Sequence, residues 1–207
     1  MKLDSQGLMP VVVQDELTGE VRMLAYATPA ALEATRATGR ATFFSRSRNA
    51  EWVKGETSGN FVDVREVRLD CDEDAALYLG RPAGPTCHTG AASCFDAGTR
   101  APLLVKLEAE LEARKSSTGE KSYTKSLYEG GALRIGEKLR EEADELARAI
   151  DGEADSRVVS EAADVVYHLM VALRHRGVAV RDVLAELDRR FGQSGHAEKA
   201  ARTGKTT

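Results

Sequence analysis

The spacing of apolar residues changes about midway along the chain, and this change constrains the fold more than any other feature. From Val11 to about Cys71, short runs of β-type residues alternate with turn signals such as Thr18-Gly19, a pattern typical of strands. From Pro102 onward, apolar residues recur with helical spacing,. The sequence therefore predicts two domains: residues 1–98, which are α+β and rich in strands, and residues 99–207, an all-α helical bundle.

Local signals define the individual elements. One helix interrupts the N-terminal strands, because Thr28 and Pro29 favour a helix start and Gly39 favours its end,. The predicted strands are Val11–Val13, Val21–Ala25, Ala41–Ser45 and Phe61–Cys71, and the predicted helices are Ala30–Thr38, Pro102–Lys115, Ser122–Gly130, Leu133–Ile150, Arg157–Arg174 and Val180–Phe191.

Composition excludes several classes of partner. The 207 residues carry a formal net charge of −4, so no overall basic surface recruits nucleic acid or an anionic membrane. No apolar run approaches the roughly 20 residues of a membrane span, and the N-terminus lacks a signal-peptide pattern, so we expect a cytoplasmic protein. Three cysteines are an odd and small number for a disulfide framework, which makes metal binding a hypothesis,.

Three aspartates lie at the end of the last predicted strand. Alternation along that strand would place Asp70 and Asp72 on one face, continued by Asp74, and would turn Cys71 to the opposite face,. Clustered carboxylates repel one another unless a cation binds between them, and their hard oxygen atoms suit Mg²⁺. A solvated acidic turn is the alternative, since short acidic runs are common at surfaces.

The cysteines Cys71, Cys87 and Cys94 offer three soft ligands without an obvious fourth. Such a set is typical of a catalytic zinc centre that keeps one position open for water. Three thiols that serve only packing are the alternative. His88, next to Cys87, could be a fourth ligand, a proton carrier or a polar loop residue,.

A polar segment over residues 45–60 combines cations, small hydroxyl residues and glycines. Forked guanidinium groups and backbone N–H groups both approach anions closely, so this segment predicts a phosphate or ribose site. A polar hairpin loop is the alternative. The candidate substrate-binding residues are Arg46, Arg48, Trp52, Lys54, Thr57 and Ser58.

Three motifs in this order resemble the phosphoribosyl-AMP cyclohydrolase family over about residues 7–95: Trp52-x-Lys54-Gly55-Glu56-Thr57-Ser58-Gly59-Asn60, Asp70-Cys71-Asp72-x-Asp74 and Cys87-His88-Thr89-Gly90-x-x-Ser93-Cys94-Phe95. The resemblance implies a dimer that binds Mg²⁺ through the three aspartates and shares Zn²⁺, held by the three cysteines, across its interface. It also implies that a zinc-activated water attacks C6 of the adenine ring and opens the N1–C6 bond. His88 would then carry a proton, and Arg46, Arg48 and Lys54 would hold phosphates. Thr28 and Ala91-Ala92 depart from the family pattern.

The helix predicted from Leu133 has an apolar stripe at i, i+4, i+7 and i+11, with Glu142 and Glu145 along one edge,. Carboxylates on a helix are usually solvated. The stripe consists of Leu139, Ala143, Leu146 and Ile150.

The next helix is almost wholly apolar, yet Glu161, Asp164 and His168 form one polar line along it,. Buried carboxylates need a partner or a metal. If this line faces Glu142 and Glu145, four carboxylates surround a shared space, which predicts a Mg²⁺ site able to bind a triphosphate. His168 is either a ligand or a hydrogen-bonded core histidine.

This carboxylate pattern resembles the all-α nucleotide pyrophosphohydrolases. A larger set resembles phosphoribosyl-ATP pyrophosphohydrolase over about residues 103–202: Ser122-Tyr123-Thr124, Lys138, Glu141-Glu142-Ala143-x-Glu145, Glu161-Ala162-Ala163-Asp164, Tyr167-His168-Leu169 and Arg189-Arg190-Phe191-Gly192. The resemblance implies metal-assisted attack of water between the α and β phosphates, with Glu142 and Glu145 as catalytic residues and Lys138 as a phosphate contact. Arg140, where glycine is common, is a minor departure.

The two resemblances support each other, because the product of the C-terminal reaction is the substrate of the N-terminal one. Together they imply a homodimer that acts on phosphoribosyl nucleotides in steps two and three of L-histidine biosynthesis. Two alternatives stay open. One is a general nucleoside-triphosphate pyrophosphohydrolase, and the other is a structural zinc module joined to a dimerisation bundle without enzymatic activity.

Overall fold

The structure is a computed structural model that describes residues 1–95, 102–116 and 122–191. It divides into two compact units, Met1–Pro102 and Leu103–Thr207. The first is rich in strands and the second is helical, which confirms the predicted fold class. The predicted boundary between residues 98 and 99 lies outside the described residues.

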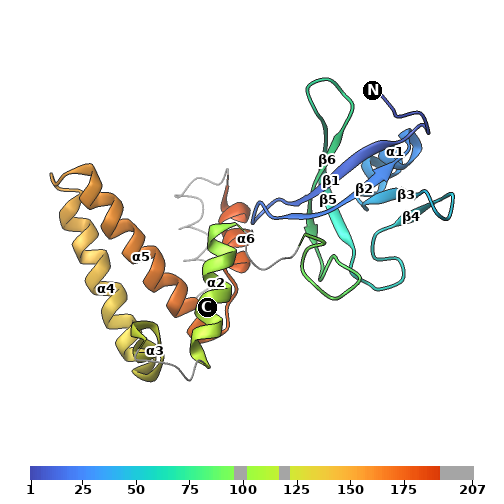
Figure 1. The fold of residues 1–207 in the computed structure, drawn as a ribbon. Coiled ribbons are helices and arrows are strands. Elements are labelled where there is room, and N and C mark those ends of the chain that lie inside the picture. Colours follow the sequence, from blue (N-terminus) through green and yellow to red (C-terminus); the bar gives the residue numbers. More distant parts are fainter. Residues whose placement is uncertain (96–101, 117–121, 192–207) are drawn as a thin grey trace, which may run out of the picture. The chain divides into compact units, whose positions relative to one another are not determined.

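The first unit is a six-stranded sheet with one helix (Figure 1). The sheet order is β4-β3-β2-β1-β6-β5, in which β1 and β6 are parallel and the other neighbours are antiparallel. The elements are β1 (Met9–Asp15), β2 (Val21–Ala27), α1 (Pro29–Thr38), β3 (Thr42–Ser45), β4 (Ala50–Val53), β5 (Val62–Leu69) and β6 (Ala76–Pro82).

Helix α1 starts and ends where the sequence predicts. The Thr28 hydroxyl accepts a hydrogen bond from the backbone N–H of Ala31 at 3.1 Å, and Gly39 ends the helix in the left-handed region at a φ of 68°,. The helix contacts β2, β3 and β5. Its buried residues join the inward-facing positions of the strands in one core, so the sheet and α1 form a single rigid frame for the loops.

Two strands, β4 and β6, were not predicted. Glycine and proline disfavour strand interiors, and both occur in β6, as Gly80 and Pro82. The glycine is required here, because a Cβ atom at Gly80 would lie 2.7 Å from the carbonyl oxygen of Asp63 on β5. Strand β5 ends at Leu69, two residues earlier than predicted.

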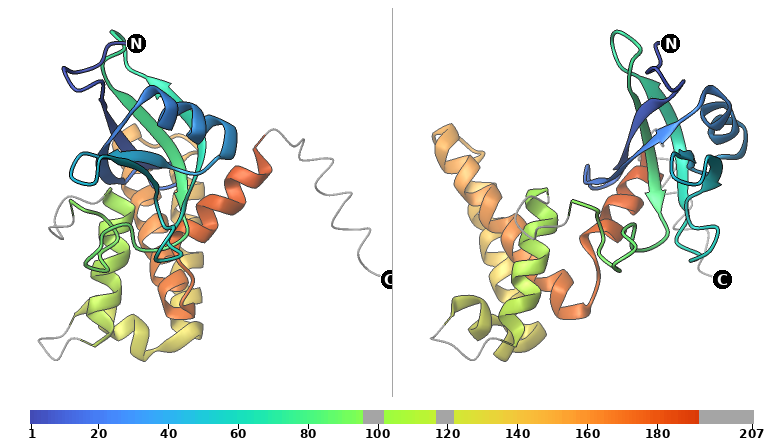
Figure 2. Two further views of the ribbon diagram at one scale, coloured as in Figure 1. Left: turned by 90° about the vertical axis from the view of Figure 1, so that its right-hand side faces the viewer. Right: turned by 45° about the vertical axis from the view of Figure 1, so that its right-hand side comes forward.

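The second unit contains the five predicted helices, each within two residues of its expected ends. They are α2 (Leu103–Lys115), α3 (Tyr123–Glu129), α4 (Gly131–Ala149), α5 (Asp155–Arg176) and α6 (Val180–Arg190). A short turn joins α4 to α5, and the two helices lie side by side along most of their length (Figure 2). Among the described residues, no helix combines the length and apolar character needed to cross a membrane.

The buried face of α4 differs from the predicted one. Within this chain α4 buries Ile135, Glu142 and Ala149, whereas Ile150, at the end of the predicted stripe, is 68% exposed. Helix α5 is also not buried all round, because Val159 is 68% exposed. The helical pair therefore carries its carboxylates inward and leaves apolar side chains uncovered in the single chain.

We predict that Tyr78→Phe lowers the free energy of unfolding of the first unit by about 1–2 kcal/mol. The buried Tyr78 hydroxyl donates to the carbonyl oxygen of Thr42 at 3.2 Å and accepts from the Thr35 hydroxyl at 3.1 Å, so its removal takes one hydrogen bond from each of two buried groups. Urea unfolding followed by the fluorescence of Trp52, the only tryptophan, measures the loss.

Tyr128→Phe is the matched control, because among the described residues the buried Tyr128 hydroxyl has no hydrogen-bond partner. Its removal should leave the helical unit as stable or more stable, measured by far-ultraviolet circular dichroism. Equal losses in the two variants would show that the hydroxyl network around Tyr78 is not stabilising.

Candidate active sites and metal centres

A cavity of about 520 Å³ opens in the strand-rich unit. It lies where β4 and the following loop meet the loop after β6. The sheet therefore brings together two segments that are apart in the sequence. One is the polar segment, and the other is the loop after β6 that contains Cys87 and Cys94, called the cysteine loop below. The predicted residues that line the cavity are Arg48, Trp52, Lys54, Thr57, Ser58, Cys87, His88 and Cys94.

The cysteine loop is anchored to the start of β2. The Ser93 hydroxyl is buried and donates to the carbonyl oxygen of Val21 at 2.7 Å, and the backbone N–H of Cys94 donates to the carbonyl oxygen of Arg22 at 2.8 Å. The predictions gave Ser93 no role, although it stands next to Cys94 in the quoted motif. These bonds fix Cys94 at the rim of the cavity.

Two thiols face each other across this loop. The Thr89 hydroxyl donates to Cys87 Sγ at 3.2 Å, and this hydrogen bond lowers the pKa of the Cys87 thiol. Removal from water and the charge of Cys87 raise the pKa of the Cys94 thiol. A pair of soft sulfur donors, one of them with a lowered thiol pKa, fits a zinc ion better than a hard cation.

Lys54 supplies a cation to the same cavity. Its side chain is only 8% exposed, and Nζ donates to the carbonyl oxygen of Asn60 at 3.1 Å. Burial lowers the pKa of Lys54, while the nearby Cys94 and Cys87 act in the opposite direction. A largely buried ammonium beside the thiols is suited to contact an anionic group of a substrate.

The third cysteine lies elsewhere. Among the described residues, Cys71 does not form a three-ligand group with Cys87 and Cys94, and it is exposed in the turn after β5. One chain therefore assembles two of the three predicted zinc ligands.

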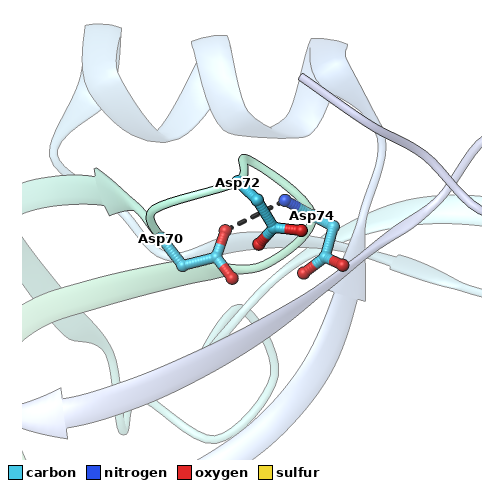
Figure 3. A group of neighbouring side chains, drawn as sticks. All are labelled: Asp70, Asp72 and Asp74. Carbon is cyan, nitrogen blue, oxygen red and sulfur yellow. Dashed lines mark hydrogen bonds between the residues drawn. The ribbon is translucent and has the colours of Figure 1, made fainter.

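The three aspartates do converge, but for a different reason than predicted. Because β5 ends at Leu69, residues 70–74 form a turn, and the turn brings carboxylate oxygens of Asp70, Asp72 and Asp74 within 4.8 Å of one another (Figure 3). The alternation argument, which placed Cys71 on an opposite strand face, is wrong. Asp70 shapes the turn, since its Oδ1 accepts the backbone N–H of Asp74 at 2.9 Å and that of Ala75 at 3.1 Å.

The electrostatics of this turn fit a hard cation. The backbone N–H of Ala75, followed by that of Asp74, lowers the pKa of Asp70, whereas the charges of Asp72 and Asp70 raise the pKa of Asp74. Lys2 Nζ lies 3.3 Å from Asp72 Oδ2 and offsets part of the repulsion. All three carboxylates are exposed, so a solvated acidic turn stays open as the alternative.

Arg46, unlike the other candidate substrate-binding residues of this domain, does not line the cavity. It lines an adjoining hollow, where its guanidinium lies 3.9 Å from the centroid of the Tyr26 ring. The departure at Thr28 has a structural role, because its hydroxyl caps α1 and donates to Glu51 at 2.9 Å. Neither Thr28 nor Ala91-Ala92 lines the cavity.

In the helical unit, carboxylate oxygens of Glu142, Glu145 and Glu161 lie within 4.8 Å of one another between α4 and α5. Glu161 is 2% exposed, and among the described residues its Oε2 has no hydrogen-bond partner. Removal from water raises the pKa of Glu161. A buried, unpartnered carboxylate oxygen aimed at two others fits a divalent cation.

The fourth predicted carboxylate, Asp164, is exposed and does not belong to this group. The expected set of four therefore contains three members in the single chain. Removal from water is the largest cause of the raised pKa of Glu161. The nearby Glu145 and, to a smaller extent, the charge of Asp164 also raise it.

Two cations flank the three glutamates. Lys138 Nζ lies 2.9 Å from Glu141 and 3.0 Å from Glu142, and these hydrogen bonds raise the pKa of Lys138. Arg157 Nη1 lies 2.6 Å from Glu161 Oε1. The predictions missed Arg157, although its position four residues before Glu161 on a helix indicates an ion pair.

His168 is held as a core histidine. Its Nδ1 lies 2.9 Å from the backbone carbonyl oxygen of Asp164, and its Nε2 lies 2.9 Å from the Tyr123 hydroxyl. A carbonyl only accepts, so Nδ1 carries the proton and the Tyr123 hydroxyl donates to Nε2. Both ring nitrogens are engaged, which favours the hydrogen-bonded alternative over direct metal ligation and gives Tyr123 a place beside the glutamates.

Comparisons with known proteins agree with this division into two sites. Residues 23–96 match the family model described as phosphoribosyl-AMP cyclohydrolase, and residues 104–191 match the one described as phosphoribosyl-ATP pyrophosphohydrolase. The protein is thus a hydrolase with two different catalytic domains in tandem.

Relatives that contain both domains cover most of the chain. The chain is 44% identical to the histidine biosynthesis bifunctional protein hisIE, chloroplastic, of Arabidopsis thaliana over 98% of this chain and 79% of the relative. It is 45% identical to the bifunctional protein HisIE of Escherichia coli (strain K12) over 90% of this chain and 92% of the relative. The chain belongs to the family of histidine biosynthesis bifunctional proteins.

We predict that Mg²⁺ raises the thermal midpoint of the helical unit by several degrees and that Glu161→Gln removes most of this shift. A ligand that binds only the folded state stabilises it by about 2.7 kcal/mol at one hundred times its dissociation constant, and Glu161 supplies a buried oxygen that has no partner in residues 1–95, 102–116 and 122–191. Thermal unfolding by circular dichroism, with and without a chelator, measures the shift.

Glu153→Gln is the control, because Glu153 also pairs with Arg157, at 3.5 Å, but lies outside the carboxylate group. It should keep the wild-type response to Mg²⁺. The same response in wild type and in Glu161→Gln would show that this group does not hold the ion.

Proposed function

We propose that the C-terminal domain hydrolyses phosphoribosyl-ATP to phosphoribosyl-AMP and pyrophosphate, and that the N-terminal domain then opens the adenine ring of phosphoribosyl-AMP. These are steps two and three of L-histidine biosynthesis. The observation that carries the proposal is the match of each half to one of these two hydrolase families, over residues 23–96 and 104–191. Each half also contains a site with suitable chemistry.

In the N-terminal domain, ring opening requires a water molecule at C6 of the adenine and a proton for N1 as the N1–C6 bond breaks. Zinc held by Cys87 and Cys94 would lower the pKa of a bound water toward neutrality. His88 lines the same cavity and is the proposed proton carrier. Lys54 and Arg48 would hold phosphate, and Trp52, Thr57 and Ser58 would contact the remaining substrate. We also propose that Asp70, Asp72 and Asp74 hold Mg²⁺.

We propose a homodimer in which Cys71 of the partner subunit completes the zinc site. Two observations support this. One chain gathers only two of the three cysteines, and α4 and α5 leave apolar side chains such as Val159, Val166 and Ile150 exposed. Burying these side chains against a second copy would remove apolar surface from water.

In the C-terminal domain, Mg²⁺ would lie between Glu142, Glu145 and Glu161, with Asp164 as a further proposed ligand. The ion would neutralise the glutamates and bind the triphosphate. Glu142 and Glu145 are the proposed catalytic residues, since they would hold the metal beside the attacking water. Lys138, which pairs with Glu142 in this structure, would exchange that carboxylate for a phosphate oxygen.

Family membership favours this proposal over the two alternatives, and substrate choice tests it. A general pyrophosphohydrolase would hydrolyse ATP and dUTP as well as phosphoribosyl-ATP, whereas a structural module would turn over none of them. The cytoplasmic location stays a prediction, and the Arabidopsis relative is named as chloroplastic. The absence of nucleic-acid and membrane partners stays a prediction too.

We predict that single substitutions separate the two activities. Cys94→Ser should still release pyrophosphate from phosphoribosyl-ATP but should lose ring opening by at least about 100-fold, because loss of a metal ligand costs no less than loss of the groups that orient it. Glu145→Gln should lose pyrophosphate release from phosphoribosyl-ATP. It should still open the ring when it is supplied with phosphoribosyl-AMP. Pyrophosphate release and the absorbance change on ring opening report the two steps, and a variant that lost both equally would contradict the assignment of domains.

We predict that the wild-type chain sediments as a dimer and that Val166→Glu shifts it toward monomer. Val166 lies on α5 and is 42% exposed, so a charge there is tolerated in the single chain but is costly in an apolar interface. Val178→Glu is the control, since Val178 is 36% exposed but follows the end of α5. Dissociation by both variants, or by neither, would argue against this face as the interface.

A further inference from the structure

Arg22, near the start of β2, contacts the cysteine loop at two points. Its backbone carbonyl oxygen accepts the N–H of Cys94 at 2.8 Å, and its side-chain Nε donates to the Thr86 hydroxyl at 3.4 Å. Thr86 directly precedes Cys87 in the chain. One residue of the sheet is therefore bonded to the loop beside both candidate zinc ligands, although Arg22 itself does not line the cavity.

The guanidinium of Arg22 is held in place by Glu20. Nη1 forms an ion pair with Glu20 Oε2, and the two side chains are only 11% and 13% exposed, whereas both members of the Arg40–Asp63 pair are exposed. An ion pair that is shielded from water is weakened less by solvent and salt. Because a guanidinium is planar and carries donors on several nitrogens, the bond from Nη1 to Glu20 leaves Nε free to donate to Thr86.

Thr86 is the point at which the side chain of Arg22 attaches the loop to the sheet. The Thr86 side chain is buried and lines the cavity. Its backbone N–H donates to the carbonyl oxygen of Ala92 at 3.3 Å, and that of Cys87 donates to Ala91 at 3.1 Å. These two bonds close the loop on itself. The bond from Arg22 to Thr86 instead joins the first half of the loop to β2.

A zinc centre needs its sulfur ligands at defined positions, because Zn–S bonds are about 2.3 Å long and the coordination is tetrahedral. Cys87 and Cys94 lie on opposite sides of a loop that contains Gly90 in the left-handed region, at a φ of 87°. A loop has more conformational freedom than a strand. The spacing of the two sulfur atoms therefore depends on where each side of the loop is bonded to the sheet.

We propose that Arg22 is a positioning residue for the zinc centre, because it fixes the cysteine loop at Thr86 through its side chain and at Cys94 through its main chain, and so sets the spacing of the two thiols. This inference rests on the proposed function, since it takes Cys87 and Cys94 as zinc ligands. Glu20 neutralises the guanidinium, so Arg22 acts through the position of its bonds and not through its charge.

The zinc affinity of the full-length chain, measured by competition with a chromophoric chelator, tests the proposal without relying on activity. The test variant combines Arg22→Met with Glu20→Gln, so that no carboxylate is left unpaired. It keeps the main-chain bond to Cys94 and loses the bond to Thr86. We expect zinc binding to weaken by about 10–100-fold, the usual effect of removing a group that orients metal ligands.

Thr86→Val tests the same bond from its other end. Valine has nearly the shape of threonine but cannot accept the hydrogen bond from Nε, so zinc binding should weaken by a similar factor. Adding Thr86→Val to the Glu20→Gln, Arg22→Met variant should cause no further loss, because both changes break one interaction. A further loss equal to that of Thr86→Val alone would show that Arg22 does not act through Thr86.

Arg22→Lys separates position from charge. Lysine keeps the positive charge, but its single nitrogen cannot bond to Glu20 and Thr86 as the separate nitrogens of arginine do. We expect this variant to bind zinc about as weakly as the methionine variant. Wild-type affinity in Arg22→Lys would show that the charge alone matters and would overturn the proposal.

Cobalt in place of zinc gives a spectroscopic readout, because the visible absorption of bound Co²⁺ depends on its ligands and their geometry. The Arg22 variants should show shifted or weaker bands than wild type. The matched control combines Arg40→Met with Asp63→Asn, which also removes an ion pair of this unit but changes no residue that lines the cavity. The control should keep the wild-type spectrum and zinc affinity.

Unchanged zinc affinity and cobalt spectrum in the Arg22 variants, or an equal loss in the control, would overturn the inference, while zinc binding by wild type left the proposed function intact. A wild-type chain that bound no zinc would overturn both. Urea unfolding of the zinc-free chains, followed by Trp52 fluorescence, checks that each variant is folded. If the Arg22 variants do not fold, Thr86→Val decides, and wild-type affinity in that variant would overturn the inference.

Discussion

The close approach of Glu142, Glu145 and Glu161 is the constraint that the packing of the helical domain has to satisfy, because their negative charges repel one another,. Helices α4 and α5 form the most extensive contact between helices in this domain, and they meet along a line that contains these carboxylates. Lys138 and Arg157 offset part of the charge, yet one oxygen of Glu161 is buried and has no partner within the part of the chain that the structure describes. Packing that places carboxylates inward carries an electrostatic cost that a bound cation would lower, so a metal that binds phosphate here would also stabilise the domain.

The strand-rich domain positions its candidate metal ligands in a different way. Its core is apolar, and the reactive groups lie in loops that leave β4 and β6. The Ser93 hydroxyl, which donates to the carbonyl oxygen of Val21, and the Cys94 backbone N–H, which donates to that of Arg22, hold the cysteine loop at the cavity. Because the sheet order places β4 and β6 apart, the loops alone close the distance between Lys54 and the thiols.

The sequence predicted the elements that depend on interactions between neighbouring residues, and it missed those that depend on contacts between distant residues. Local signals sufficed for α1, because a cap and a C-terminal glycine act within one turn, and for the five C-terminal helices. Strand β6 escaped prediction because Gly80 is explained only by its close approach to Asp63. The polar line on α5 predicted the convergence of Glu161 with Glu142 and Glu145, whereas the buried face of α4 depends on its neighbour and was predicted incorrectly. Motifs identified the cysteines, but no single-chain pattern could place Cys71 apart from Cys87 and Cys94.

The central claim is that one chain performs two consecutive hydrolyses at two independent metal centres. The most direct test supplies wild-type protein, loaded with Mg²⁺ and Zn²⁺, with phosphoribosyl-ATP and records pyrophosphate and ring opening in the same time course. We expect pyrophosphate first, ring opening after a lag with equal final yield, and loss of only the second signal when a zinc-selective chelator is added. Simultaneous loss of both signals with the chelator, or ring opening without prior pyrophosphate release, would contradict the claim.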